Sequence, residues 1–168
     1  MTEVRTVLAG VALAIAAGSL ADQPITFDGI GAVRVGSSVR DASRAAGEDL
    51  VEAEDKPSGT EGCYHVRLNS APSVLFMVRE DRIVRVETAD SRFRTKSGVR
   101  VGDSEARVRG IYGSRLEVTE HKYREAGHYF IVRSADRRHA LVMETDGKLV
   151  VYIRAGLEPA AEYAEGCL

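Results

Sequence analysis

Histidine is the side chain best suited to acid–base or metal chemistry at neutral pH. The chain contains four of them: His65, His121, His128 and His139. No pair has the H-x-x-x-H or H-E-x-x-H spacing of a zinc site, and no serine lies in a G-x-S-x-G nucleophile elbow. We therefore expect no catalytic residue, no metal site and no cofactor, and we interpret the histidines as surface or edge-strand residues. A small hydrolase is a minor alternative.

The N-terminus has the layout of a secretory signal peptide. Residues 7–18 (VLAGVALAIAAG) form an apolar run of twelve, which is too short to cross a bilayer. Ser19-Leu20-Ala21 then places small residues at both positions that a signal peptidase reads. We predict a signal peptide over 1–21 and an exported protein, periplasmic or extracellular. The alternative is a buried N-terminal helix.

The chain has two cysteines, Cys63 and Cys167, and both lie in the predicted mature segment. Two isolated thiols lack the spacing of a metal site, and in an exported protein they indicate one disulfide. We expect this bridge to tie the middle of the chain to its C-terminus.

Composition indicates a soluble globular protein and excludes several partner classes. The 168 residues carry a formal net charge of −2, which does not favour nucleic-acid binding. No integral membrane segment is expected in the mature chain.

The sequence VRVGSSVRDASRAAG at 33–47 returns as VRVGDSEARVRGIYG at 99–113, and the register of 66 residues continues without a gap. In each copy a serine, Ser38 or Ser104, is placed to cap a helix. Gly47 and Gly113 follow at the positions of C-caps. Each copy therefore predicts a helix of two to three turns.

Strands are expected after each helix. Apolar residues alternate with polar ones at 64–68 and 130–133, and mostly apolar runs follow at 74–78 and 140–143. Turn signals at 80–81 and 146–147 lead to strands at 83–88 and 149–154. Further strands are expected at 50–54 and 116–122. The predicted fold class is α+β, a tandem duplication in which each repeat is one short helix plus a three- to four-stranded antiparallel meander. The boundaries are 1–21 for the signal peptide, 22–92 for repeat 1, 93–156 for repeat 2 and 157–168 for a C-terminal tail.

A helix introduced by V-x-x-G-[STD]-[ST], ended by glycine and followed by a meander resembles the small bacterial envelope modules of the SmpA/OmlA type. Two such units in tandem resemble β-lactamase inhibitory protein in architecture. The resemblance implies an envelope protein built from two repeats.

These features agree best with a non-catalytic module that binds another protein. An inhibitor would be one example of such a module. The alternative is a structural envelope factor without a discrete ligand. If Val66 and Val132 face the core, their strand neighbours point to the opposite face, and the unlike loops 55–62 and 121–128 offer further contacts. The candidate partner-binding residues are Asp55, Lys56, His65, Arg67, Lys122, Tyr123, Ile131 and Arg133.

Overall fold

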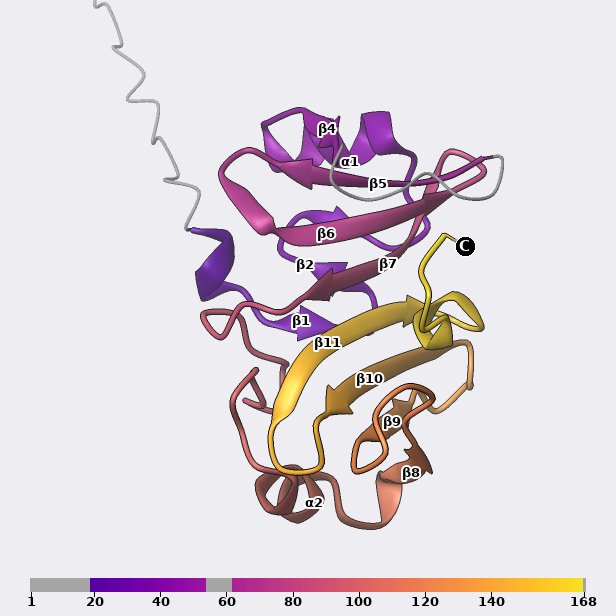
Figure 1. Cartoon of the computed structure of the whole chain (residues 1–168). Coiled ribbons are helices and arrows are strands. Elements are labelled where there is room, and N and C mark those ends of the chain that lie inside the picture. The colour runs from indigo at the N-terminus through magenta and orange to yellow at the C-terminus, as the bar shows by residue number, and fades with distance from the viewer. Residues whose placement is uncertain (1–18, 54–61, 168) are drawn as a thin grey trace, which may run out of the picture.

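One antiparallel sheet of eight strands runs through the molecule (Figure 1). The computed structural model describes residues 19–53 and 62–167. The strands lie in the order β4-β5-β6-β7-β11-β10-β9-β8. Their bounds are β4 Leu50–Glu52, β5 Cys63–Leu68, β6 Ala71–Arg79, β7 Arg82–Thr88, β8 Glu117–Glu120, β9 His128–Arg133, β10 His139–Thr145 and β11 Val150–Leu157.

The remaining described elements are short. A three-stranded sheet, β1-β2-β3, precedes the first helix. Figure 1 shows α1 at the β4 end of the large sheet and α2 at the β8 end. The bounds are β1 Ile25–Thr26, β2 Gly29–Ile30, β3 Val33–Arg34, α1 Val39–Ala46 and α2 Glu105–Tyr112, with 3-10 turns η1 Leu20–Asp22, η2 Gly113–Arg115 and η3 Ala160–Glu162.

Both predicted helix starts are confirmed by their capping bonds. Ser38 Oγ accepts a hydrogen bond from the Asp41 amide at 3.1 Å, and Ser104 Oγ accepts one from the Arg107 amide at 3.2 Å. Gly47 ends α1 in the left-handed region, with φ of 71°, which glycine adopts without a steric penalty. Local sequence therefore determines where these two helices begin.

The predicted fold class, a tandem duplication of helix-plus-meander units, is wrong. The structure is mostly β, its two α-helices have eight residues each, and an additional three-stranded sheet is present. The strands do not form two separate meanders, because β7 pairs with β11 from Arg85↔Gly156 to Thr88↔Ile153. The edges that two isolated meanders would expose hydrogen-bond to each other instead.

One face of the sheet, which we call the helix-covered face, carries the main hydrophobic core. Strand alternation sends apolar side chains to this face, where the helices and the small sheet pack on them. Its buried sheet residues include Val66, Phe76, Val86, Phe130, Val132, Met143 and Ile153, and the covering elements contribute Ile25, Ile30, Val33, Ala42, Val108 and Tyr112.

The opposite face is covered by the C-terminal segment, residues 158–167, and we call it the tail-covered face. η3 packs against β7, β10 and β11. Ala161 joins Ile131, Ala140 and Val142 in a small apolar cluster. The predicted Cys63–Cys167 disulfide is confirmed, with a Cα–Cα distance of 5.4 Å. The sheet is therefore buried on both faces.

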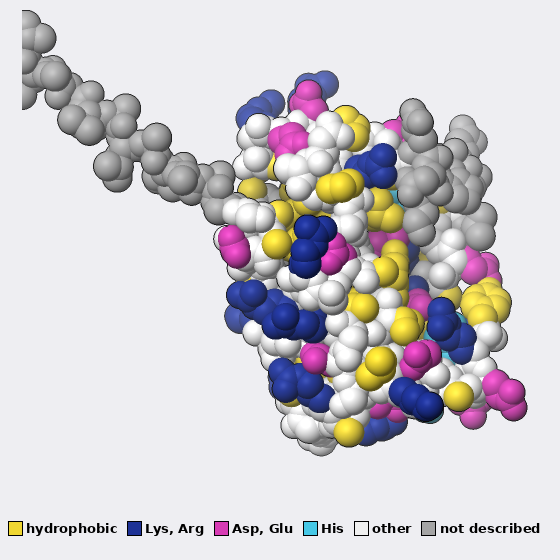
Figure 2. Space-filling view, turned by 60° about the vertical axis from the view of Figure 1, so that its left-hand side comes forward, with side chains coloured by type: hydrophobic (Ala, Val, Ile, Leu, Met, Phe, Trp, Pro, Cys, Tyr) yellow, Lys and Arg dark blue, Asp and Glu magenta, His cyan; other side chains and the backbone are white. Residues whose placement is uncertain are grey.

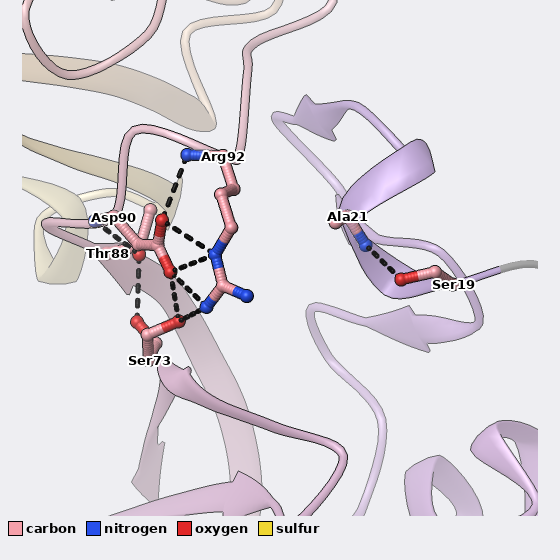
Figure 3. A network of polar contacts seen from close by, with 6 residues as sticks. All are labelled: Ser19, Ala21, Ser73, Thr88, Asp90 and Arg92. Carbon is pink, nitrogen blue, oxygen red and sulfur yellow. Dashed lines mark hydrogen bonds and ion pairs between the residues drawn. The ribbon is translucent and has the colours of Figure 1, made fainter.

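A polar network fixes the end of β7, where the chain leaves the sheet (Figure 3). The Thr88 hydroxyl donates to the Ser73 carbonyl at 2.8 Å, and the Ser73 hydroxyl donates to Asp90 Oδ2 at 2.7 Å. The Arg92 guanidinium binds the same carboxylate and holds the pKa of Asp90 well below its usual range. This network sets the direction of the connection from β7 toward α2.

The described surface mixes charge types. On the face drawn in Figure 2, several Lys and Arg side chains gather toward the left-hand side, and acidic and hydrophobic side chains are scattered over the rest of the described surface. No helix within residues 19–53 and 62–167 is long and apolar enough to cross a membrane. The predicted signal peptide falls mostly on residues 1–18, outside the described part, and its cleavage after Ala21 stays a prediction.

Candidate binding site

Charged side chains gather at the middle of the tail-covered face, where β7 meets β11. Alternation along β7 puts Arg85 and Glu87 on this face, while Val86 joins the main core. Arg154 of β11 is the cross-strand partner of Glu87. Arg85, Glu87 and Arg154 are each 2% exposed, so the centre of this face is a buried ionic layer.

His65, Arg85 and Glu87 form the first group, which we call the Arg85 cluster. Arg85 Nη2 contacts Glu87 Oε2, and His65 Nε2 lies 3.4 Å from Glu87 Oε1. Arg85 Nη1 donates to the carbonyls of Ala160 at 2.9 Å and Tyr163 at 2.8 Å. The cluster therefore fastens the C-terminal segment to the sheet.

The Arg85 cluster keeps Glu87 ionised despite its burial. Burial alone raises the pKa of this carboxyl, but the positive charge of Arg85 and the contact with His65 outweigh it and lower the pKa to about 2. Tyr152 also hydrogen-bonds to Glu87. Burial and the negative charge of Glu87 raise the pKa of Tyr152, so its hydroxyl stays protonated.

His121, Glu144 and Arg154 form the second group, the Arg154 cluster. Arg154 Nη1 lies 2.5 Å from Glu144 Oε1, and His121 Nε2 lies 3.4 Å from Glu144 Oε2. Burial lowers the pKa of Arg154, and the charge of Glu144 opposes that shift. Arg154 Nε and Nη2 and the Tyr129 hydroxyl have no hydrogen-bond partner among the described residues, although all are buried.

Two cavities lie beneath the C-terminal segment. The first, the β9 cavity, has a volume of about 460 Å³, and the second, the β7 cavity, about 430 Å³. Arg154 lines both cavities, together with 164–166 of the C-terminal segment. The sheet contributes Tyr129, Ile131 and Val142 to the β9 cavity. A buried guanidinium therefore lies beside two partly open cavities, and the wall of the β9 cavity contains both apolar and charged side chains.

The loop 121–127 stands beside this segment and is held closely against the β10–β11 turn. The His121 amide donates to the Gly127 carbonyl at 2.9 Å, and the Tyr123 amide donates to His121 Nδ1 at 3.0 Å. A Cβ on Gly127 would stand 2.6 Å from the Thr145 carbonyl oxygen, so this close approach requires glycine. Lys122 Nζ lies 2.6 Å from Glu165 Oε1, and the Tyr123 hydroxyl contacts the same oxygen.

Two of the predicted partner-binding residues are inaccessible. His65 and Ile131 do point away from the main core, but each is only 4% exposed. The C-terminal segment covers this face. We correct the prediction for these two residues, because in this structure they have no surface to offer a partner. Arg67 lies on the same face and is half-buried.

The remaining candidates divide between the interior, the surface and the undescribed part of the chain. Arg133 contacts Glu117, Glu158 and Glu162, so its guanidinium is used inside the molecule. Lys122 and Tyr123 are exposed. The other two candidates, Asp55 and Lys56, lie outside the described residues.

Sequence reasoning missed the residues at the centre of the site, Arg85, Glu87, Glu144 and Arg154. A signal was present in the strand sequences RIVRVET and VVYIRAGL, which place charged residues among apolar ones. Such alternation normally indicates a face open to solvent. The burial of this face depends on a distant C-terminal segment that has no strand or helix pattern of its own.

The histidines are used as contacts within the fold. Each of the four lies near a carboxylate: the pairs are His65–Glu87, His121–Glu144, His128–Glu105 and His139–Asp28. Among the residues that the structure describes, no group of three or more His, Cys, Asp or Glu side chains is placed to hold a metal ion.

Comparisons with known proteins assign no family. No family model and no curated protein matches the chain. A similar solved structure is an extracellular protein containing an SCP domain from Bacillus anthracis str. Ames, with 11% sequence identity and a TM-score of 0.47. The match covers 94% of this chain and 50% of that chain, so this chain spans half of the other's length. The resemblance to SmpA/OmlA-type modules stays a prediction.

Proposed function

We propose that the protein is an exported, non-catalytic binding protein whose partner is another protein. The observation that carries this proposal is Tyr123, a large aromatic side chain that is 61% exposed. Tyrosine is among the residues that contribute most to protein interfaces, because it buries a large area and has few rotatable bonds. Arg124 is exposed beside it and adds a cationic group for carboxylates of the partner, whereas Lys122 is already paired with Glu165.

The loop that presents Tyr123 is ordered before any partner binds. Its backbone closes through the Gly127 amide, which donates to the Arg124 carbonyl at 2.9 Å. Lys122 Nζ lies 5.1 Å from the centre of the Tyr123 ring, and Glu165 contacts both side chains. A preorganised loop loses little conformational entropy on association, which favours affinity.

A non-catalytic role is supported by the way the histidines are used. His121 Nε2 faces Glu144, and its Nδ1 accepts a hydrogen bond from the Tyr123 amide. His65 Nε2 faces Glu87, and its Nδ1 lies 3.9 Å from Cys167 Sγ. A general base needs a nitrogen directed at the substrate, and neither ring offers one here. Export is supported by the disulfide, a bond typical of oxidising compartments.

The test compares two exposed hydrophobic residues. Tyr123→Ala removes the proposed contact, and Leu149→Ala is the matched control, since Leu149 is 43% exposed and lies near Ser104 at the start of α2. Each variant and the wild-type protein, with the disulfide intact, is cross-linked in an envelope extract. The captured protein is then identified, purified and titrated directly.

We expect Tyr123→Ala to weaken binding of the purified partner at least tenfold, because a central aromatic contact contributes about 2 kcal/mol or more. Leu149→Ala should bind like the wild-type protein. Equal affinity of the two variants would contradict the proposal. A hydrolytic activity abolished by substituting one histidine would replace it with the enzyme alternative.

A further inference from the structure

We infer that the β9 cavity is a binding site for a small monocarboxylic acid with an apolar body, and that Arg154 holds its carboxylate. This site adjoins the Tyr123 loop, because Lys122 and Glu165 line the cavity, but it does not depend on the proposed protein partner. Three features support it: the unused edge of Arg154, the composition of the cavity wall, and the charges around the cavity.

The unused donors of Arg154 have the geometry that a carboxylate requires. Glu144 occupies Nη1, whereas Nε and Nη2 have no partner among the described residues. In a guanidinium these two nitrogens point their N–H bonds to the same side, and that edge binds a carboxylate through two parallel hydrogen bonds. Arg154 is 2% exposed, so an unmade bond at this edge is costly.

A third donor lies in the same cavity. Tyr129 lines it, and the Tyr129 hydroxyl is buried without a partner among the described residues. Its ring is held in place by stacking on His121, with centroids 4.5 Å apart, and lies 5.8 Å from the Arg154 guanidinium carbon. Tyr129 and Arg154 lie on the two strands that flank β10. Tyr129 pairs with Glu144 of β10 and Arg154 pairs with Val142, two residues away on the same face of that strand.

Part of the cavity wall is apolar and can contact the uncharged body of a ligand. Ile131 and Val142 line it beside Arg154, and both belong to the small apolar cluster of the tail-covered face. A volume of about 460 Å³ lies in the usual range for small-molecule sites. Apolar walls with a few fixed polar groups are typical of such sites, where the polar groups orient the ligand.

The surrounding charges select a monoanion over a polyanion. Glu120, Glu162 and Glu165 also line the β9 cavity. Glu162 is bound by Arg133, and Glu165 is bound by Lys122, but together the three carboxylates repel a ligand with several negative charges. One carboxylate at Arg154 followed by an uncharged chain meets less of that repulsion than a ligand with several negative charges. Inorganic phosphate and dicarboxylates should therefore bind weakly.

The probe for this site is hexanoate, titrated calorimetrically into the purified wild-type protein with its disulfide intact. We expect saturable one-to-one binding and a rise in melting temperature with hexanoate concentration. Hexan-1-ol, which keeps the apolar chain without the charge, should bind at least tenfold more weakly. Inorganic phosphate should give no saturable signal.

Three variants test the residues. Arg154→Lys keeps a positive charge beside Glu144 but removes the two-pronged edge, and we expect hexanoate affinity to fall at least tenfold. Tyr129→Phe removes one hydroxyl from an otherwise unchanged ring, and affinity should fall about twofold to tenfold. Arg44→Lys is the matched control, because Arg44 lies on α1 with its side chain 72% exposed. This control should bind like the wild-type protein.

Several results would overturn the inference. Absence of hexanoate binding to the wild-type protein would do so, as would equal affinity in Arg154→Lys, Tyr129→Phe and Arg44→Lys. Phosphate binding as tightly as hexanoate would contradict the selection of a monoanion. If hexanoate failed to bind while Arg154→Lys lost a captured protein, the carboxylate would come from a partner chain and the small-acid site would be rejected. If Arg154→Lys proved unfolded by circular dichroism, Tyr129→Phe would decide.

Discussion

The Arg85 cluster and the Arg154 cluster contain the same three residue types on the same face of one sheet, and they differ in what else the arginine binds. Arg85 donates to the carbonyls of Ala160 and Tyr163. Arg154 binds Glu144 and has two nitrogens, Nε and Nη2, that no described residue uses, whereas in Arg85 this holds for Nε. A buried arginine surrounded by main-chain acceptors acts as a structural clamp, whereas one with an unused edge facing a cavity is available to a ligand.

We expect the disulfide to make the largest single contribution to stability among the contacts of the C-terminal segment, which covers both clusters. Replacing both Cys63 and Cys167 by Ala should lower the free energy of unfolding by about 4–5 kcal/mol, because the bridge closes a loop between residues 104 apart. Urea denaturation of the variant and of the wild-type protein measures this. Reduced wild-type protein is the control and should show the same loss. A difference below about 1 kcal/mol would contradict the expectation that the bridge stabilises the fold by restricting the unfolded chain.

Arg85 should contribute more to stability than Arg154. Arg85→Ala leaves Glu87 buried without its cation and frees two carbonyls, so we expect a loss of about 3 kcal/mol or more in urea denaturation. Arg154→Ala should cost about half of that, because no main-chain acceptor loses a donor and Glu144 is less deeply buried than Glu87, with side-chain exposures of 15% and 3%.

Arg44→Ala, at an exposed ion pair on α1, is the control and should change little. Equal losses for Arg85→Ala and Arg154→Ala would remove the distinction between a clamp and a ligand-binding arginine.

Acid should weaken the Arg85 cluster in a defined pH window. The folded-state pKa of Glu87 is lowered from 4.5 to about 2, so its stabilising effect is complete above about pH 4.5 and is lost as the pH falls toward 2. The lowered pKa corresponds to about 3 kcal/mol of unfolding free energy. The difference between wild type and Glu87→Gln should therefore shrink between pH 5 and pH 2.5.

Glu125→Gln, at an exposed position of the loop 121–127, serves as the control for this measurement. It should show no comparable change with pH. A difference between wild type and Glu87→Gln that stays constant from pH 5 to pH 2.5 would mean that Arg85 does not hold the carboxylate ionised.

In this protein the sequence predicts local structure well, but it predicts poorly which distant segments pack against the sheet. Ser38 and Ser104 mark the two helix starts because a capping hydroxyl acts within three residues. Cys63 and Cys167 could be paired because no other cysteine competes. The pairing of β7 with β11 could not be read from alternation, since alternation gives each strand two faces but names no neighbour. His65 and Ile131 were placed at the surface because nothing in the sequence of 158–167 indicates that it lies across a sheet.

The smallest expected effect concerns residues 164–166 of the C-terminal segment, which line both cavities. Lys122 Nζ contacts Glu165 Oε1 at 2.6 Å, but both side chains are largely in solvent, at 61% and 42% exposure. Lys122→Ala should therefore change the free energy of unfolding by less than about 1 kcal/mol.

Amide hydrogen exchange in Lys122→Ala should nevertheless become faster at residues 164–166, where the segment loses a side-chain contact. The amides of Glu162 and Tyr163 should keep their protection, because Arg85 holds the Ala160 and Tyr163 carbonyls independently of Lys122. Faster exchange spread evenly over residues 160–166 would instead mean that the whole segment opens as one unit, and that the two clusters do not differ in how they hold their cover.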